Sequence, residues 1–199
     1  MSLCKKYDID GINVDIESIK KDSGEYYVQF IKEISTFSHL NNLVLSVDMY
    51  MPTKSNEYYG RSEFTPYVDY YCLMAYDEHW RTCGVAGSVG SLPWVEKGLK
   101  GTLEIVPKDK LILGIPFYTR LWGVDKKGEV VSSKALGMEN ATENLEENKA
   151  KTKFDKTTGQ NYSEYKKDNI TYKVWLEDET SISSRLALAS RYGLGGVAS

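Results

Sequence analysis

Polar and apolar residues alternate strictly near the start of the chain. From Gly11 to Glu17 every second residue is β-branched, and the residues between them are polar: Asn13, Asp15 and Glu17. Two residues is the side-chain period of a β-strand, so this segment is predicted to be a strand. The β-branched residues Ile12, Val14 and Ile16 suit burial under a helix, and the acids are then expected to point into a barrel or cleft.

Helices and further strands follow in alternation. Asp22 and Glu25 have the spacing of a capping box, and apolar residues then recur at helical spacing as far as Phe37. Turn and breaker residues separate the remaining predicted elements: a strand at Leu43–Met49, a strand at Val68–Tyr76, a helix from Ser91 to about Val106, a strand at Leu111–Tyr118, a helix at Thr180–Tyr192 ended by Gly193, and a strand from Gly195 to Ser199. Strands that alternate with helices favour an α/β fold with a parallel sheet.

One polar stretch, residues 123–173, does not fit this alternation and is interpreted as an insertion before the last strand. Within it, Glu139–Lys151 is compatible with a solvated helix, and Phe154–Leu176 with a hairpin region that turns near Thr158-Gly159. The insertion is therefore expected to be a small α+β element.

Composition excludes several classes of function. The chain has 199 residues, 41% of them hydrophobic and 27% charged, with a formal net charge of −3 and no basic stripe for nucleic acid. It contains neither an apolar run of membrane-spanning length nor a signal peptide. The three cysteines are odd in number and lack CxxC spacing, so free thiols are expected, with no metal site and no cofactor. The 15 tyrosines and four tryptophans suit the apolar faces of sugars.

The acidic segment itself has two simpler interpretations. Successive residues on one face of a strand lie about 6.6 Å apart, so Asn13, Asp15 and Glu17 form a polar line. A calcium-binding loop is disfavoured, because such loops carry a turn-forming glycine and do not alternate ligands with β-branched residues. Surface acids on an edge strand are disfavoured by the apolar character of the residues between them.

The segment Asp10-Gly-Ile-Asn13-Val-Asp15-Ile-Glu17 resembles the signature of glycoside hydrolase family 18, the chitinase-like enzymes. That signature, Asp-Gly-x-Asp-x-Asp-x-Glu, ends the fourth strand of a (β/α)8 TIM barrel, and Asn13 here replaces its second acid. Three later segments resemble the sixth strand, the seventh strand and the approach to the eighth: Met74-Ala-Tyr76-Asp77, Leu113–Arg120, and Val174-Trp175 to Val197. The resemblance implies that residues 1–199 are a single partial catalytic domain covering roughly strands 4 to 8.

A narrower resemblance concerns the kind of sugar. The Asn13 variant, together with Tyr76-Asp-Glu-His79-Trp80, resembles the bacterial spore-cortex and cell-wall N-acetylglucosaminidase branch of the family. It implies a substrate that contains N-acetylglucosamine, chitin or peptidoglycan, and an extracytoplasmic parent protein. A lone histidine in a loop is more often structural, and neither histidine of the chain suggests a metal.

The resemblance implies a glycosidase with a retaining, substrate-assisted mechanism. Glu17 would protonate the leaving oxygen and later act as base toward water, and Asp15 would hold the acetamido N–H of the substrate. Tyr76 would donate to the acetamido oxygen. The sugar pocket would be lined by Asn13, Met74, Asp77, Tyr118 and Arg120. Asn13 cannot share a proton with Asp15 but is expected to donate a hydrogen bond to it.

Three alternatives stay open at this point. Some members of the family are lectin-like sugar-binding modules that have lost the catalytic acid, although Glu17 argues against this. Others act on protein-linked glycans. The chain could also be an inactive truncated fragment, because five of eight strands do not close a barrel and unpaired edges favour self-association. The linkage cut and endo or exo action are not determined by these motifs.

Overall fold

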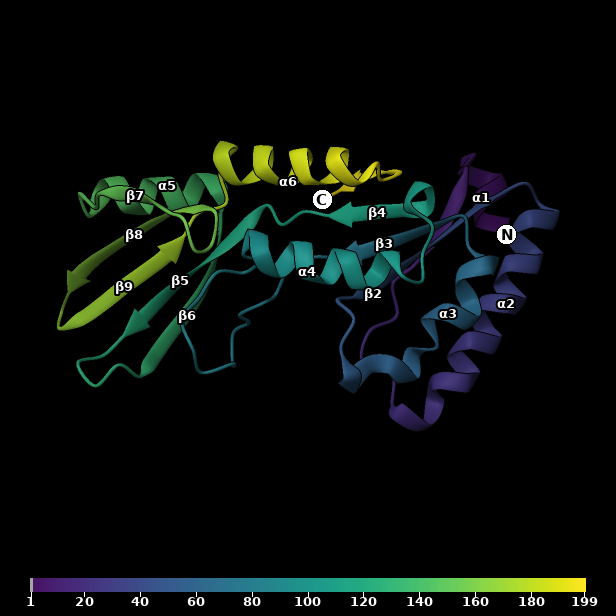
Figure 1. Cartoon of the computed structure of the whole chain (residues 1–199), viewed down its shortest axis with the longest axis horizontal. Helices are drawn as coiled ribbons and strands as arrows, with labels where there is room; N and C mark the ends of the chain where they lie inside the picture. The colour runs from purple at the N-terminus through teal and green to yellow at the C-terminus, as the bar shows by residue number, and fades with distance from the viewer. Residues whose placement is uncertain (1) are drawn as a thin grey trace. The chain divides into compact units, whose positions relative to one another are not determined.

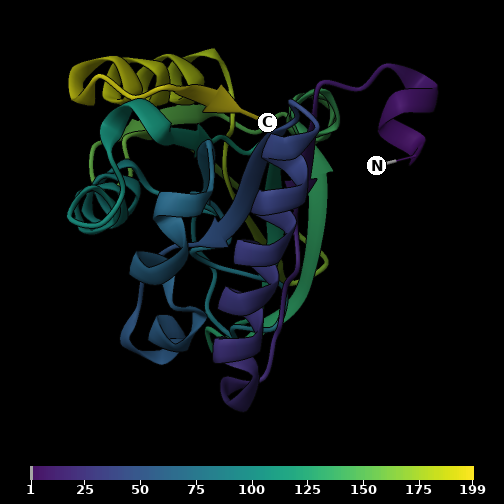
Figure 2. The ribbon, with the colours of Figure 1, turned by 90° about the vertical axis from the view of Figure 1, so that its right-hand side faces the viewer.

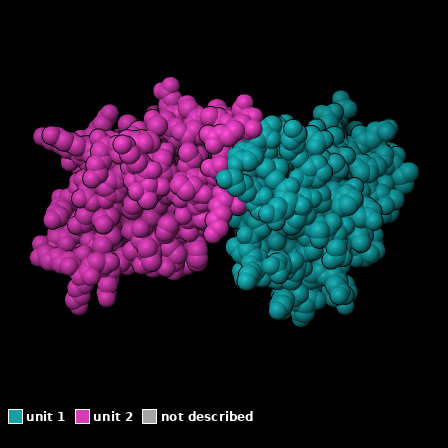
Figure 3. Space-filling model, viewed as in Figure 1, with its two compact units in different colours: residues 1–74, 98–114, 192–198 teal, residues 75–97, 115–191, 199 magenta. Residues whose placement is uncertain are grey.

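A computed structural model describes residues 2–199, with side chains from Leu3 onward. The chain forms two compact units (Figure 3). Unit 1 contains residues up to 74 together with 98–114 and 192–198. Unit 2 contains residues 75–97, 115–191 and 199. Each unit has its own sheet, and each is described by itself.

Unit 1 is built on a parallel five-stranded sheet in the order β1-β2-β3-β4-β10. Figure 1 labels its three central strands, β2, β3 and β4. Its strands are β1 (Gly11–Val14), β2 (Val44–Tyr50), β3 (Tyr70–Met74), β4 (Leu111–Gly114) and β10 (Gly196–Ala198). The helices and 3-10 turns of this unit are α1 (Ser2–Tyr7), η1 (Lys21–Ser23), α2 (Gly24–Leu40), η2 (Lys54–Tyr59), α3 (Arg61–Phe64), η3 (Thr65–Tyr67) and η4 (Lys108–Lys110). Helix α4 (Leu92–Leu103) belongs to this unit from Gly98 onward, and α6 (Glu179–Tyr192) belongs to unit 2 apart from Tyr192. The predicted partial, open α/β sheet is confirmed.

The period-two pattern of β2 explains how this sheet is covered. Leu45, Val47 and Met49 are at most 1% exposed, and complete burial of such a side chain stabilises the fold by about 1.5–3 kcal/mol. Helix α2 runs alongside the sheet (Figure 2). Its Ile31 is fully buried, and the ring of Tyr27 meets other aromatic rings edge to face. The alternate residues of β2 therefore face away from this apolar layer.

Two predictions about the first strand and helix were wrong in detail. Strand β1 ends at Val14 instead of Glu17, so the two acids follow the strand. Val14 is buried as expected but Ile16 is 41% exposed, because β1 is an edge of the sheet and Ile16 lies beyond its ladder. The capping box at Asp22 is not formed: a 3-10 turn occupies Lys21–Ser23, and α2 begins at Gly24 without a side-chain cap.

The segment predicted as one strand from Leu111 to Tyr118 is divided in the structure. Strand β4 ends at Gly114, and Tyr118 begins β5 (Tyr118–Val124), which belongs to a different sheet. Pro116 lies in the gap and has no backbone N–H for a ladder, which explains why regular pairing stops there.

Unit 2 contains an antiparallel sheet in the order β6-β5-β9-β8-β7. Besides β5, its strands are β6 (Val130–Gly137), β7 (Thr152–Asp155), β8 (Gln160–Lys167) and β9 (Ile170–Trp175). Helix α5 (Met138–Glu147) packs against β5 and β6. The core of the unit consists of Leu121, Leu136, Ala141, Leu145, Val174 and Leu176. The helix and the hairpin expected in the polar stretch are both present, and the hairpin turns at Gly159, whose φ is +71°.

Two further findings concern the described residues as a whole. Cys4, Cys72 and Cys83 are free thiols, as predicted. No helix among residues 2–199 has both the length and the apolar character needed to cross a bilayer.

Candidate active site

The acidic side chains of unit 1 lie just beyond the carboxyl end of β1. Asn13 pairs with Ser46 of β2, and Val14 with Val47, so the same register continued by one residue places Asp15 beside Asp48. Asp15 and Glu17 are exposed to solvent. In parallel α/β sheets the loops at this end of the strands carry the functional groups, because side chains from several strands converge there.

Asn13 makes a different contact from the one predicted. Its amide nitrogen Nδ2 donates to Oδ2 of Asp48 at 2.8 Å, rather than to Asp15. Its amide oxygen accepts a hydrogen bond from Ser46 Oγ at 2.6 Å. Both ends of the amide are therefore held by β2, and the neighbouring strand supplies a carboxylate next to the asparagine.

Glu17 also has a partner on β2. The hydroxyl of Tyr50 donates a hydrogen bond to Oε2 of Glu17. Burial, and next the hydrogen bond and charge of Glu17, raise the pKa of Tyr50, so this phenol stays protonated and remains a donor at neutral pH.

Asp48 and Tyr50 were not predicted as site residues. A signal was available, because Ser46, Asp48 and Tyr50 alternate with apolar residues in β2 as the acids do near β1. Choosing Asp48 and Tyr50 from that pattern requires the pairing register of the two strands, which the pattern alone does not determine.

The electrostatic environment of Asp15 is acidic. Desolvation, then the carboxylate of Asp48, then that of Glu17 raise the pKa of Asp15 above its ordinary value. Asp15 therefore holds a proton more readily than an isolated aspartate. This is the environment expected of a group that stores or shares a proton.

Met74, the last residue of β3, is 8% exposed and belongs to unit 1. Four of the predicted site residues belong to unit 2: Tyr76, Asp77, Tyr118 and Arg120. Tyr76 and Asp77 are adjacent in the chain, and Tyr118 begins β5. The hydroxyl of Tyr118 donates to Oδ1 of Asp77, and the rings of Tyr76 and Tyr118 meet edge to face at 6.3 Å. Three of the predicted residues are thus brought together.

Arg120 lies two residues further along β5. Its guanidinium donates from Nη1 to Ser133 Oγ at 3.0 Å, and its buried Nε has no hydrogen-bond partner among the described atoms. Asp77 has a φ of +60°, a left-handed conformation that Asp and Asn tolerate better than most residues.

A buried polar network lies beneath the loop that carries Tyr76 and Asp77. The carboxylate of Glu177 and the guanidinium of Arg185 form an ion pair at 2.7 Å, and both side chains are at most 1% exposed. Arg185 also donates to the carbonyl oxygen of Gly90. A Cβ on Gly90 would lie 2.9 Å from the carbonyl oxygen of Ala75, so the two backbones are in close contact.

Further hydrogen bonds extend this network. Gln160 donates to Glu177 at 2.8 Å and accepts from Ser88, and Ser181 donates to Glu177 at 2.7 Å. The backbone N–H of Ser91 donates to the Glu78 carboxylate at 2.7 Å. This network was not predicted from the sequence. Its contacts between Gln160 and Ser88 and between Arg185 and Gly90 join residues that are far apart along the chain.

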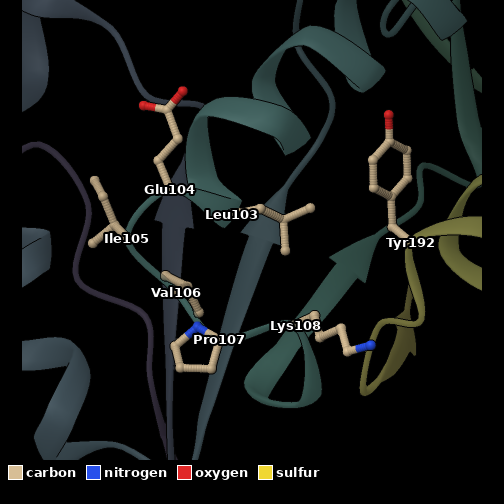
Figure 4. Close-up of a pocket in the computed structure, with 7 residues that line it drawn as sticks. All are labelled: Leu103, Glu104, Ile105, Val106, Pro107, Lys108 and Tyr192. Atoms are coloured by element: carbon tan, nitrogen blue, oxygen red, sulfur yellow. The ribbon is translucent and has the colours of Figure 1, made fainter.

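Two other features can be separated from the acidic site. Among residues 2–199 no three His, Cys, Asp or Glu side chains are grouped as a metal would require. A hollow of about 470 Å³ in unit 1 is lined by residues 103–108 and Tyr192 (Figure 4). It adjoins the segment that leads into β4, so it lies at the amino end of the parallel strands, away from the end where Asp15 and Glu17 follow β1.

A family model described as glycosyl hydrolases family 18 matches residues 1–199. The chain belongs to this family. The predicted resemblance is therefore confirmed over the whole chain, and the chain is a member of a glycosidase family.

Individual relatives agree with this assignment. The uncharacterised glycosylase YvbX of Bacillus subtilis is 30% identical over 99% of this chain and 58% of its own length. The cortical fragment-lytic enzyme of Bacillus anthracis is 24% identical over 99% of this chain and 47% of its own length. The crystal structure of a chitinase from Chromobacterium violaceum superimposes with a TM-score of 0.88, 25% identity, and coverage of 98% of this chain and 62% of that chain. The chain spans about half the length of these curated relatives.

Proposed function

We propose that this family 18 protein hydrolyses β-glycosidic bonds to N-acetylglucosamine in peptidoglycan or chitin, by a retaining mechanism in which the acetamido group of the substrate takes part. The observation that carries the proposal is Glu17, an exposed carboxylate just beyond a parallel strand, with Asp15 two residues before it and the Tyr50 hydroxyl bonded to it. A carboxyl group in this position can reach a glycosidic oxygen and exchange a proton with it.

In the proposed mechanism Glu17 donates its proton to the leaving oxygen as the glycosidic C–O bond breaks and the acetamido oxygen of the substrate attacks the anomeric carbon. Asp15 accepts the acetamido N–H. Glu17 then removes a proton from a water that attacks the anomeric carbon, the bond from that carbon to the acetamido oxygen breaks, and the protonated Glu17 is restored. Since the substrate supplies the nucleophile, one protein acid is sufficient.

We further propose that Tyr76 donates to the acetamido oxygen and that the sugar is contacted by Met74, Asp77, Tyr118 and Arg120. The hydrogen bond from Tyr118 to Asp77 supports a shared role for these two residues. Residues 1–199 are proposed to be one partial catalytic domain, with residues 123–173 as an insertion within it.

Peptidoglycan is favoured over chitin as the natural substrate, since two relatives are named cortical fragment-lytic enzymes, in Bacillus anthracis and Bacillus subtilis. Action on a wall or a spore cortex would take place outside the cytoplasm.

The test is Glu17→Gln in the protein of full natural length, assayed on peptidoglycan fragments and on a fluorogenic N-acetylglucosamine oligomer. Loss of at least about 100-fold in kcat is expected, since general acid catalysis contributes on that order. Glu33→Gln is the matched control, because it makes the same change of acid to amide at an exposed residue of α2. The Glu33 side chain accepts a hydrogen bond from Gln29. Near-parental turnover by the Glu17 variant would falsify the assignment, and sugar binding without turnover in the parent would favour a lectin-like module.

A further inference from the structure

The family signature places an aspartate where this chain has Asn13, so one carboxylate of the motif is missing. The structure has an acid nearby that the motif does not include. Asp48 lies on β2, half-buried, and its strand pairs with β1 in parallel register. The same register continued by one residue brings Asp48 next to Asp15.

The contacts of Asp48 explain why it stays near the end of β1. Oδ2 of Asp48 accepts the Asn13 amide at 2.8 Å, and Ser46 holds the other end of that amide at 2.6 Å. On the other side, its partner in the β2–β3 ladder is Cys72. Strand pairing and the bond from the Asn13 amide therefore keep Asp48 close to β1.

We propose that Asp48 supplies, from the adjacent strand, the second carboxylate beside Asp15 that Asn13 cannot provide, and that it acts as a positioning residue which keeps one proton on the Asp15–Glu17 pair. The inference rests on the proposed function of Glu17. Adjacent carboxylates do not ionise together easily, so a charge on Asp48 favours the protonated form of its neighbour. An asparagine alone would orient Asp15 without this electrostatic effect.

Several other groups act on the same environment. Glu17 follows β1, Tyr50 is on β2, Cys72 on β3 and Tyr27 on α2. Burial raises the pKa of Cys72 to about 12 and also raises that of Tyr27, so both are neutral at physiological pH. The hydroxyl of Tyr50 is neutral for the same reason. Asp48 and Glu17 are therefore the charges that act on Asp15 in this group.

The test relocates the carboxylate. Asp48→Asn removes it, and the double variant Asn13→Asp with Asp48→Asn returns it to the position it has in the family signature. The pKa of Asp15 is followed by carboxylate-carbon NMR titration of the folded chain. It should fall by about one pH unit in Asp48→Asn and recover in the double variant, as expected for a neighbouring like charge. Glu33→Gln is the control and should leave the titration unchanged.

The second readout is the pH profile of kcat/KM in the protein of full natural length. The limb of this profile that reflects ionisation of the Asp15–Glu17 pair should move to lower pH in Asp48→Asn. It should return to its original position in the double variant. An unchanged Asp15 titration in Asp48→Asn would overturn the inference. A shifted titration in a parent without turnover would instead refute the proposed function and leave the role of Asp48 intact. If Asp48→Asn does not fold, Asp48→Ser takes its place, and the same fall in the pKa of Asp15 is expected because the neighbouring like charge is again removed.

Discussion

The Tyr50 hydroxyl donates a hydrogen bond to the Glu17 carboxylate, although 33 residues separate them along the chain. It ties the proposed acid to the neighbouring strand and limits the rotamers that Glu17 can adopt. Positioning of a reacting group is one of the larger contributions to enzymatic rate.

Tyr50→Phe removes this donor and keeps the ring. We expect kcat/KM to fall about tenfold, because a hydrogen bond to a charged group contributes about 1.5–3 kcal/mol. Steady-state assays on the fluorogenic oligomer measure the change, with Glu17→Gln as the lower limit. Tyr26→Phe is the control, since Tyr26 is 76% exposed on α2. Equal rates for parent and Tyr50→Phe would show that the bond has no catalytic role.

Asp77 permits a comparison of charge with backbone conformation. Asp77→Asn removes the charge but tolerates the φ of +60°, whereas Asp77→Ala adds strain of about 1 kcal/mol. Both variants should raise KM, and only Asp77→Ala should also lower stability. In both, the pKa of Tyr118 should fall, because Asp77 is a principal cause, after burial, of its rise. Phenol titration by ultraviolet absorbance and denaturant unfolding separate these effects. A KM unchanged in both variants would exclude Asp77 from sugar binding.

The Glu177–Arg185 pair should be sensitive to the loss of either partner. Arg185→Met leaves a buried carboxylate without its guanidinium, which typically costs about 3–5 kcal/mol. Urea unfolding curves measure the loss, and the double variant Arg185→Met with Glu177→Gln should recover part of it. A loss below about 1 kcal/mol would contradict the importance assigned to the pair.

The cost of Arg185→Met should also depend on pH. Burial is the largest cause that raises the pKa of Glu177, from 4.5 to about 7 in the fold. The contribution of a group with a raised pKa is fully present below its unfolded pKa and is lost as pH rises through its folded pKa. Arg185→Met should therefore be less destabilising at about pH 5, where Glu177 carries a proton, than at about pH 8. Equal costs at both pH values would indicate that Glu177 does not titrate in this range.

The open sheet of unit 1 leads to a prediction about the 199-residue chain by itself. Strands β1 and β10 are its edges, and α2 exposes Phe37 and Leu40 at 60% and 77%. Unpaired edges and exposed apolar side chains favour association. We expect this chain to self-associate and to hydrolyse the oligomer little or not at all.

Light scattering and the fluorogenic assay test the two parts of this prediction. Val197→Lys should reduce association, because lysine on an edge strand opposes pairing with another chain. Thr142→Lys, on the exposed surface of α5, adds the same charge away from the edge and should have no effect. A strictly monomeric chain with robust turnover would contradict both parts.

The sequence by itself determined the local elements and the acidic segment. Three local patterns carried these predictions: alternating β-branched and polar residues from Gly11 to Glu17, apolar residues at helical spacing in α2, and Gly193 at the end of α6. Each extends over a few residues and depends only on neighbours in the chain. The resemblance of four ordered segments then indicated the family, which the comparison confirmed. In the polar stretch, the hairpin was predictable from its turn residues Thr158-Gly159.

Only the tertiary structure decided which side chains meet. Asp48 and Tyr50 reach Asn13 and Glu17 through the parallel register of β1 and β2, and a shift of one residue would turn both toward the opposite face. The break at Pro116 places Tyr118 in an antiparallel sheet, and Arg185 donates to the Gly90 carbonyl 95 residues away; both depend on contacts that the local sequence pattern does not specify. Sequence periodicity indicates which face of an element is buried. Long-range packing and strand pairing determine which residues contact that face.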